Sequence, residues 1–366
     1  MKLKVGVLCG GRSGEHEVSL KSAASIIEAL DKEKYLVVPI GITRDGTWLA
    51  GDDPLEALST GVIPGNNKAI SLVPDPSVGG FTWLAEASPG KSFEKLDVVF
   101  PVLHGTYGED GTVQGLLELA GIPYVGPGVL AASAGMDKVI MKMVFQQKGL
   151  PIGKYVYFLK KDWEENKEFW LDKIERELGY PCFIKPCNMG SSVGISKAKS
   201  RQELQVAVEE AGLWDRRIVV EEFVEGREIE VSVLGKDRPS ASVPGEVVPS
   251  SEFYDYQAKY IDDRSQLIIP AKLTPELADR VKDLAVESFT ALDCTGMARI
   301  DFFVEEEKDK IIVNEVNTIP GFTQVSMYPK LWEASGMSYS RLLDRLIELA
   351  IDRFEEKKQL KTVFDL

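Results

Sequence analysis

The chain has 366 residues, a net charge of −14 and 44% hydrophobic residues. This length exceeds one ordinary core and predicts two or three domains of a globular protein. The acidic balance argues against a nucleic-acid binder, and no stretch reaches the ~18 continuous apolar residues of a membrane span. Four cysteines without a CxxC pair, and only two histidines, favour reduced thiols in a cytoplasmic protein over a zinc site.

The first region is predicted to begin as a parallel α/β unit. Its pattern gives a strand, a glycine turn, a helix and a second strand, at Lys4–Leu8, Gly10–Gly14, Val18–Leu30 and Tyr35–Ile42. The turn is not a dinucleotide fingerprint, because Cys9 takes its first glycine position and the second strand does not end in an acid. Glu15 and Glu17 lie where a helix dipole also favours acids, so a structural role stays open for each.

Residues 60–95 are rich in Gly, Pro and Ser and are expected to form a loop with short strands. Another buried strand, Asp97–Pro101, then runs into the loop HGTYGEDG at 104–111, before a helix at Thr112–Ala120. Such a loop at the carboxyl end of a parallel strand is where α/β sheets bind ligands. His104 could serve either a structural or a functional role in this loop.

The second region carries two lysines beside elements suited to phosphate. The expected helices, strands and loop are Asp137–Lys148, Trp163–Leu178, a strand ending at Lys185, the loop Cys187–Gly194, and Ile218–Glu222. Lys138 lies in a first helical turn, where the dipole disfavours a cation and a bound anion would favour one. The small-residue loop has no Walker motif but could cover phosphates with its N–H groups, or simply form a permissive turn.

The third region is expected to form strands from Arg227 to about Val248, then a helix at Thr274–Leu292 and a last helix at Ser338–Phe354. Between the strands and the first helix lies SSEFYDYQAKYIDD at 250–263. A polar, aromatic loop of this length is typical of a lid.

A hairpin in this region joins Met297–Val304 to Lys310–Asn317. Strand alternation places Arg299 with Asp301 on one face, and Glu315 with Asn317 on one face. A turn centred near Glu307 would set Asp301 opposite Val313, one diagonal step from Glu315. Carboxylate and amide oxygens are ligands that hold Mg²⁺ beside phosphates. The alternative is an ordinary charged face on which Arg299 pairs with Asp301.

Eight motifs in order resemble the D-alanine–D-alanine ligase family of ATP-grasp enzymes, over nearly the whole chain. They are GGRSGEHEVS (10–19), HGTYGEDG (104–111), MDK (136–138), FIKPCNMGSSVG (183–194), EEFVEGRE (221–228), YDYQAKY (254–260), ARIDFF (298–303) and NEVNTIPGFTQVS (314–326). The resemblance implies a mixed α/β, three-domain ATP-grasp fold. Its parts would be a substrate-binding domain at 1–135, a central ATP-grasp subdomain at 136–225 and a catalytic domain at 226–366 with the lid 250–263.

The resemblance also implies the activity and the roles of individual residues. The expected reaction joins two D-alanine molecules through an acyl phosphate, with release of ADP and phosphate, for peptidoglycan precursor synthesis. ATP would contact Lys138, Lys185, Ser191, Ser192, Glu221, Glu222, Phe223, Val224, Glu228, Phe253, Phe303 and Asn314. Two Mg²⁺ or Mn²⁺ ions would be held by Asp301, Glu315 and Asn317. A homodimer is the family expectation.

The substrates and the transition state are assigned in the same way. The first D-alanine would place its ammonium on Glu15, helped by Ser191 and Tyr260, with His104 nearby. Ser326, with Lys259, would hold the carboxylate of the second D-alanine. Arg299 and the Gly321 N–H would stabilise the oxyanion, so that Arg299 is not a neutralising partner of Asp301.

Two alternatives remain at this stage. A ligase of the same fold could use D-lactate or D-serine as its second substrate, although Tyr260 resembles the plain dipeptide ligases rather than the D-lactate enzymes. A nucleotide-binding regulatory protein could have kept the fold and lost the chemistry. The presence of Glu15, Ser326 and all three metal ligands disfavours this second alternative. Glu222 stands where some family members carry Lys, which could alter the adenine contacts.

Overall fold

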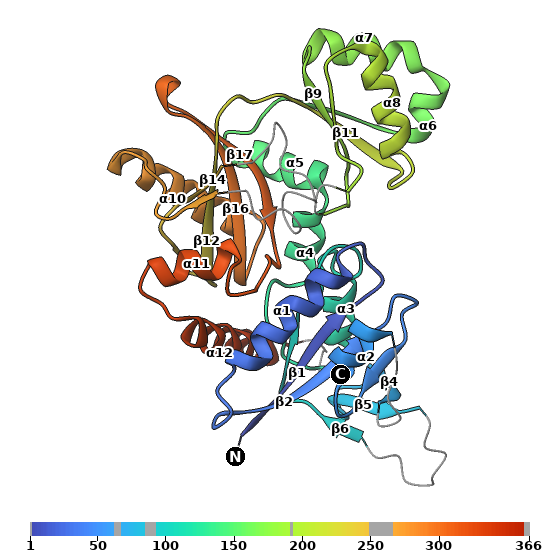
Figure 1. Ribbon diagram of the computed structural model, residues 1–366, viewed down its shortest axis with the longest axis vertical. Helices are drawn as coiled ribbons and strands as arrows, with labels where there is room; N and C mark the ends of the chain where they lie inside the picture. Colours follow the sequence, from blue (N-terminus) through green and yellow to red (C-terminus); the bar gives the residue numbers. More distant parts are fainter. Residues whose placement is uncertain (1, 62–66, 85–92, 191–192, 249–265, 362–366) are drawn as a thin grey trace.

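The computed structural model describes residues 2–61, 67–84, 93–190, 193–248 and 266–361. Three β-sheets are stacked along the long axis, each with its own helices (Figure 1). The expected lid at 250–263, with Phe253, Lys259 and Tyr260, lies outside the described residues, as do Ser191 and Ser192. No helix among the described residues is long and apolar enough to cross a membrane.

The first sheet has the order β6-β5-β4-β3-β2-β1-β7. Its parallel part joins β1 (Leu3–Gly10) to β2 (Tyr35–Ile42) and to β7 (Val98–Pro101). An antiparallel extension adds β3 (Trp48–Ala50), β4 (Lys68–Leu72), β5 (Gly80–Trp83) and β6 (Phe93–Lys95). The helices of this part are α1 (His16–Ala29), α2 (Pro54–Thr60) and α3 (Thr112–Leu119). The carboxyl ends of β1 and β7 therefore present the two glycine loops at one edge.

The second sheet is antiparallel, with the order β10-β9-β11-β8. Its strands are β8 (Tyr155–Leu159), β9 (Cys182–Pro186), β10 (Ser196–Ala198) and β11 (Arg217–Glu222). Three helices cover one face: α6 (Lys160–Glu165), α7 (Lys167–Glu177) and α8 (Arg201–Ala211). The opposite face carries Lys185 and Glu221.

The third sheet contains the hairpin and has the order β15-β14-β12-β16-β17, with β13 paired to β12. Its strands are β12 (Arg227–Gly235), β13 (Ser240–Ala241), β14 (Gly245–Val248), β15 (Gln266–Ile268), β16 (Gly296–Glu305) and β17 (Lys310–Asn317). A 3-10 turn, Glu306–Lys308, joins β16 to β17. The helices in this half of the chain are α10 (Pro275–Ala291), α11 (Met327–Ala334) and α12 (Tyr339–Lys358).

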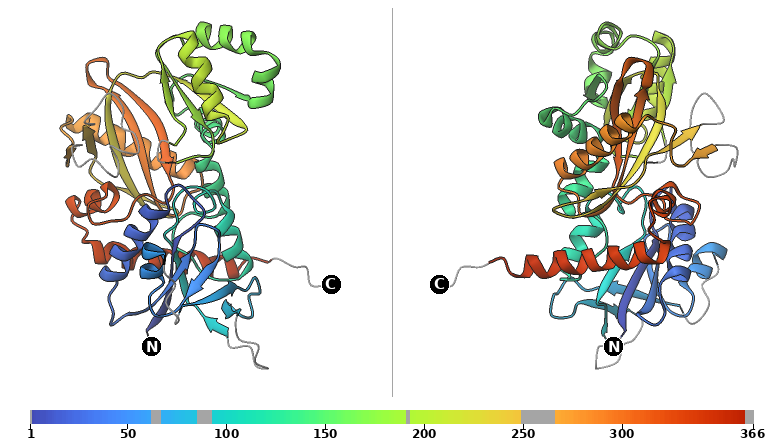
Figure 2. Two further views of the ribbon diagram at one scale, coloured as in Figure 1. Left: turned by 45° about the vertical axis from the view of Figure 1, so that its right-hand side comes forward. Right: turned by 90° about the vertical axis from the view of Figure 1, so that its left-hand side faces the viewer.

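Helices α5 (Lys138–Lys148) and α12 each pack against a sheet outside the segment, 136–225 or 226–366, to which the expected domain boundaries assign them. α5 buries Met141 and Phe145 in the core of the third sheet, together with α4 (Val129–Met136) and α10. α12 buries Leu342 and Leu346 in the core of the first sheet, and it crosses the face of that sheet that α1 also covers (Figure 2). The last helix thereby ties the C-terminal part of the chain to the N-terminal sheet.

Most predicted elements are confirmed within a few residues, and β2 has the predicted bounds. The single helix predicted at Trp163–Leu178 is wrong, because Asn166 leaves the helical region at φ −140° and ψ 50° and separates α6 from α7. Asn competes for backbone hydrogen bonds and therefore favours helix ends. The four cysteines are buried, and none of them forms a disulfide.

Replacing Thr274 with alanine is expected to destabilise the third sheet's helix α10. Thr274 Oγ1 accepts a hydrogen bond of 3.3 Å from Leu277 N as the N-cap, and losing such a cap costs about 1 kcal/mol. Denaturant unfolding measures this loss. Thr290→Ala is the matched control, because the side chain of this exposed residue in the last turn of the same helix donates to Val286 O and caps no helix start. The free energy of unfolding of this variant should change by less than about 0.5 kcal/mol.

Candidate active site

The polar face of the hairpin is built by a β-bulge. Phe302 pairs with Val313, but Asp301 pairs with Glu315, which leaves Asn314 as the extra residue. The expected position of Asp301 opposite Val313 was therefore wrong. Directly opposite residues in an antiparallel pair share a face, so the bulge brings the Asp301 and Glu315 carboxyl groups side by side. Strand alternation alone would have left Asn314 in that place.

Arg299 is held between two carboxylates. Its Nε and Nη2 donate to the two Asp301 oxygens at 2.7 Å each, and its Nε lies 2.9 Å from Glu230 Oε2. Burial alone would lower the pKa of Arg299, but Asp301 and Glu230 hold it well above the usual value. The expectation that Arg299 does not neutralise Asp301 is wrong for this structure, because a guanidinium buried beside two carboxylates pairs with both.

Glu230 is a site residue that the sequence reasoning missed. It is buried on β12 directly opposite Asp301, and Glu228 lies two residues earlier on the same face, opposite Phe303. The alternation of these two acids with Ile229 and Val231 was the available signal. Three strands thus contribute charged side chains to one surface.

The donors proposed for metal ions have suitable chemistry. Among the described residues, no group of three or more His, Cys, Asp or Glu side chains is arranged to hold a metal ion. Asp301 and Glu315 supply two carboxylates, and Asn317, whose Nδ2 donates to Asp301 Oδ2 at 2.9 Å, adds an amide oxygen. Because Mg²⁺ prefers oxygen ligands and binds through few carboxylates plus substrate phosphates, this set fits it.

The second sheet offers a buried ion triad. Glu221 Oε1 lies 2.9 Å from Lys142 Nζ, and Glu221 Oε2 lies 2.7 Å from Lys185 Nζ. Burial would raise the pKa of Glu221, but the two lysines lower it to about 2. Glu315 in turn helps raise the pKa of Lys185, so the polar faces of the second and third sheets oppose each other here. Lys142 was not identified from the sequence.

Lys138 lies at the start of α5, as expected, beside the small-residue loop. Its Nζ donates to Met189 O at 2.7 Å, and Asp137 caps the helix by accepting from the N–H groups of Val139 and Ile140. Because Met189 belongs to the 187–194 loop, Lys138 joins the helix start to the loop proposed to cover phosphates.

The remaining candidates for ATP contacts lie around the connection from β11 to β12. Glu222 Oε1 accepts from Lys154 N at 2.8 Å, so this carboxylate supports the backbone of its neighbour. The exposed ring of Phe223 lies 6.2 Å from the ring of Phe183 and under Lys197 Nζ at 4.5 Å. Other candidates here are part-buried: Val224, Glu228, Phe303 and Asn314.

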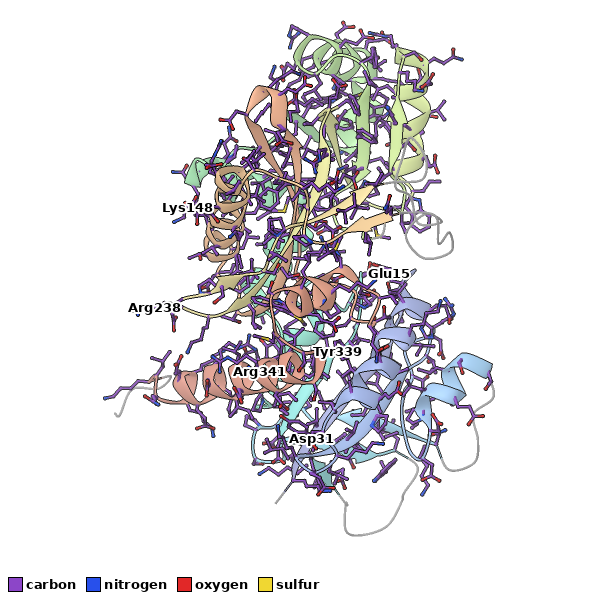
Figure 3. All side chains as sticks on the ribbon, turned by 60° about the vertical axis from the view of Figure 1, so that its left-hand side comes forward. Glu15, Asp31, Lys148, Arg238, Tyr339 and Arg341 are labelled. Carbon is purple, nitrogen blue, oxygen red and sulfur yellow. The ribbon has the colours of Figure 1, made fainter. Side chains whose placement is uncertain are left out.

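Glu15 lies where two glycine loops meet. It is the buried N-cap residue of α1, at the end of the helix that faces the middle of the molecule (Figure 3). A Cβ built on Gly105 would lie 2.5 Å from Glu15 Oε2, and one built on Gly190 would lie 2.6 Å from it. The backbones of the 104–111 and 187–194 loops therefore both touch this carboxylate. Glu17, by contrast, is exposed and pairs with Arg44, which agrees with the structural role left open for it.

His104 is buried and engaged by the protein on both ring nitrogens. Its Nδ1 lies 3.0 Å from Ile319 O, and its Nε2 lies 3.3 Å from Ser22 Oγ. Burial lowers the pKa of His104, which favours the neutral ring. Glu109 completes the link, because its carboxylate accepts from Gly105 N at 2.8 Å and from Ile319 N at 3.1 Å. Both residues thus anchor the 317–323 loop to the first sheet.

The last two candidates, Gly321 and Ser326, lie in the 317–323 loop and just after it. Ser326 is the N-cap residue of α11, and its Oγ lies 2.8 Å from Thr323 Oγ1. A Cβ built on Gly321 would lie 3.2 Å from Ser326 Oγ, so the Gly321 backbone and this hydroxyl are neighbours. The site therefore collects side chains from all three sheets and from the loops between them.

Comparison with known families identifies the chain. The family profile for the D-ala D-ala ligase N-terminus matches residues 4–127, and the profile for the D-ala D-ala ligase C-terminus matches residues 144–348. The chain belongs to the D-alanine–D-alanine ligase family. A D-alanine–D-alanine ligase of Natranaerobius thermophilus is 52% identical over 363 residues, which cover 99% of each chain. The resemblance read from the eight motifs is thereby confirmed.

Solved structures agree with this family. The VanG D-Ala:D-Ser ligase of Enterococcus faecalis superposes with a TM-score of 0.85 at 39% identity, over 96% of this chain and 100% of the other. The D-alanine-D-alanine ligase of Coxiella burnetii gives 0.83 at 36% identity, over 98% of both chains. The ATP-grasp fold class expected from the sequence is confirmed.

A separate groove of about 1190 Å³ lies outside this site. It is lined by Ile140 and Met143 of α5, by β8 and by Trp170 of α7. These α5 side chains point away from Lys138 and Lys142, which lie one turn apart on another face of the helix. Tyr155 of β8 borders both the groove and the ion triad, because it lines the groove and its ring lies 5.9 Å from Lys142 Nζ.

Replacing Gly190 with alanine is expected to raise the KM for D-alanine about tenfold while the melting temperature stays unchanged. The new Cβ would displace the Glu15 carboxylate, and this flexible side chain can move without unfolding the chain. Steady-state kinetics with thermal melting measures both quantities. Gly115→Ala is the control, since nothing lies within 4 Å of its Cβ. An unchanged KM in Gly190→Ala would contradict the placement of Glu15.

Proposed function

We propose that the protein ligates two D-alanine molecules to D-alanyl-D-alanine at the expense of ATP, releasing ADP and phosphate, in peptidoglycan precursor synthesis. The family membership supports this reaction. The observation that carries it is the contact of Glu15 with Gly190, because it joins an ammonium anchor to the loop suited to phosphates. We place the enzyme in the cytoplasm, where its free thiols stay reduced.

The first step activates a carboxylate, which is a poor electrophile until ATP phosphorylates it. Phosphoryl transfer depends on positioning and charge neutralisation. Glu15 binds the ammonium of the first D-alanine, whereas Lys138 and Lys185 approach the phosphates from α5 and β9. Two Mg²⁺ or Mn²⁺ ions held by Asp301, Glu315 and Asn317 would neutralise phosphate charge.

The second step forms the peptide bond. The neutral amine of the second D-alanine attacks the carbonyl carbon of the acyl phosphate, and the electrons of the carbonyl π bond move onto its oxygen. The tetrahedral intermediate then collapses: the bond from carbon to the phosphate oxygen breaks, phosphate leaves, and the nitrogen releases a proton as the peptide bond forms. Arg299 and the Gly321 N–H are donors suited to that oxyanion, and Ser326 lies next to Gly321 to bind the second carboxylate. In this structure Arg299 pairs with Asp301 and Glu230. To donate to the oxyanion, its guanidinium must give up or share part of its hydrogen bonding to these two carboxylates.

Three further assignments accompany the reaction. The segments 1–135, 136–225 and 226–366 act as substrate-binding, central and catalytic domains, with 250–263 as the lid. The enzyme works as a homodimer, which light scattering coupled to size-exclusion chromatography tests. ATP and D-alanine are its small-molecule partners.

The decisive experiment measures ADP release by the purified protein with ATP, Mg²⁺ and D-alanine. ADP release that depends on D-alanine, together with D-alanyl-D-alanine detected by mass spectrometry, is expected. Absence of D-alanine-dependent ADP release would exclude this function and leave the non-catalytic ATP-binding alternative.

A D-serine acceptor is the second candidate, because the VanG D-Ala:D-Ser ligase is among the similar structures. The relative at 52% identity is named a D-alanine–D-alanine ligase, which favours D-alanine. Competition assays with D-alanine plus D-serine or D-lactate distinguish the three acceptors by product mass. A larger kcat/KM for D-serine or D-lactate than for D-alanine would overturn the preferred acceptor.

A further inference from the structure

The buried triad of Lys142, Glu221 and Lys185 contains one residue to which the proposed reaction gives no role. Lys142 is 3% exposed, and its Nζ lies 2.9 Å from Glu221 Oε1. Lysine is rarely this buried unless it is paired. The position of Lys142 therefore depends on the charge of Glu221.

Local geometry brings the three charges together. Lys138 and Lys142 are four residues apart on α5, so both point from the same face of the helix towards the nucleotide side. Lys185 pairs with Val219 across β9 and β11, which places Glu221 diagonally beside Lys185 on the same face. The single carboxylate of Glu221 thus bridges a lysine from the helix and a lysine from the sheet.

The other charged and titratable groups act on the two lysines. Glu315 and Glu228 favour the charged form of Lys185. The ring of Tyr155, whose pKa burial raises, lies 5.9 Å from Lys142 Nζ. Glu221 is the acid that the two lysines share, and both Lys142 and Lys185 favour its ionised form.

A bound phosphate changes the balance of this triad. Lys185 is the triad member proposed to contact the nucleotide phosphates, so binding draws its ammonium away from Glu221. A buried carboxylate that loses one of its two cations is costly unless the second cation remains. Lys142 is that second cation, and among the described residues Glu221 is the acid with which it forms an ion pair.

We propose that Lys142 is a positioning residue that keeps Glu221 ionised and in place while Lys185 transfers from Glu221 to the nucleotide phosphates. This inference rests on the proposed function, because it takes Lys185 as a phosphate contact. Lys142 touches neither phosphate nor adenine. It acts through Glu221 alone.

Removal of Lys142 has a consequence that a purely structural residue would not produce. In Lys142→Met, nucleotide binding leaves Glu221 without a cation, so this carboxyl group takes up a proton. Binding that takes up a proton strengthens as the pH falls and weakens as the pH rises. In the wild-type protein Lys142 holds Glu221 ionised throughout, so binding of the same nucleotide is not coupled to this proton.

The test measures ADP and ATP binding with Mg²⁺ by calorimetry, in buffers of different ionisation enthalpy between about pH 6 and 8. Lys142→Met is expected to bind about tenfold more weakly than the wild-type protein at the upper pH and to take up nearly one proton per nucleotide. Lys148→Met is the matched control from the exposed end of the same helix, far from Glu15 (Figure 3). Its affinity and proton uptake should equal those of the wild-type protein.

A second pair of variants makes the test independent of the folding of Lys142→Met. Glu221→Gln removes the charge that Lys142 serves, so Lys142→Met/Glu221→Gln should match Glu221→Gln in affinity within about threefold. A loss of about tenfold or more in that comparison would mean that Lys142 contacts the nucleotide directly, and would overturn the proposal. Unchanged, pH-independent binding by a folded Lys142→Met would also overturn it.

The wild-type titration separates this inference from the proposed function. Absence of nucleotide binding to the wild-type protein would overturn both. Normal binding and turnover by the wild-type protein, with a Lys142→Met variant that behaves identically, would overturn the role of Lys142 alone.

Discussion

Asp301→Ala is expected to lower D-alanine-dependent ADP release by about a thousandfold or more. Asp301 contacts each of the other polar residues on this face of the hairpin. It accepts two hydrogen bonds from Arg299 and one from Asn317, and it lies opposite Glu315. Its loss removes a proposed metal ligand and frees Arg299 from its closest carboxylate. Turnover should fall with every acceptor, because phosphorylation of the first D-alanine precedes the choice of the second substrate.

The fold should survive this change. Arg299 keeps its ion pair with Glu230 at 2.9 Å, so no buried charge loses all of its partners. Glu305→Ala is the control on the same strand, because Glu305 pairs with Lys308 and Lys310 at the far end of the hairpin. Melting temperatures of both variants should lie close to that of the wild-type protein. An Asp301→Ala variant that keeps about a tenth or more of the wild-type activity would contradict the metal platform.

The sequence is sufficient to predict most helices and strands and to select most of the residues that the structure brings together at the candidate site. β2 was predicted with its observed bounds because its apolar run is bordered by polar residues. The Thr274-Pro275 pair marked the start of α10, since a capping side chain followed by Pro at the first position is specific to helix starts. Glu15, Lys138, Lys185 and Asp301 were identified from separate motifs, and their motifs lie next to glycine loops or strand ends.

What the sequence could not supply depends on contacts between distant segments. The bulge at Asn314 determines whether Glu315 or Asn314 lies opposite Asp301. No residue type near the turn predicts this bulge. Lys142 and Glu230 each acquire their role from a charge on another element. α4 was missed for a different reason, because its residues are small or apolar on all sides and give no helical period.

Arg299→Met is expected to damage both catalysis and stability. As the proposed oxyanion donor, Arg299 would contribute about 3–4 kcal/mol to transition-state stabilisation, so kcat should fall by two to three orders of magnitude. As the buried cation between Asp301 and Glu230, its removal should also cost about 3–5 kcal/mol of folding free energy. Chemical denaturation and steady-state kinetics on the same sample measure the two losses separately.

Arg299→Lys separates the two roles. A lysine keeps the positive charge for Asp301 and Glu230, so most of the stability should return, but it lacks the planar fork of donors and should not restore kcat. The pH dependence gives an independent check on the Met variant. In this variant the buried carboxyl groups of Asp301 and Glu230 have lost the guanidinium, so they bind protons more tightly in the folded than in the unfolded state. The stability that these two groups contribute is therefore fully present at low pH and is lost as the pH rises through their raised pKa values. A stability deficit that does not change between about pH 5 and 8 would show that lost packing, rather than uncompensated carboxylates, is responsible.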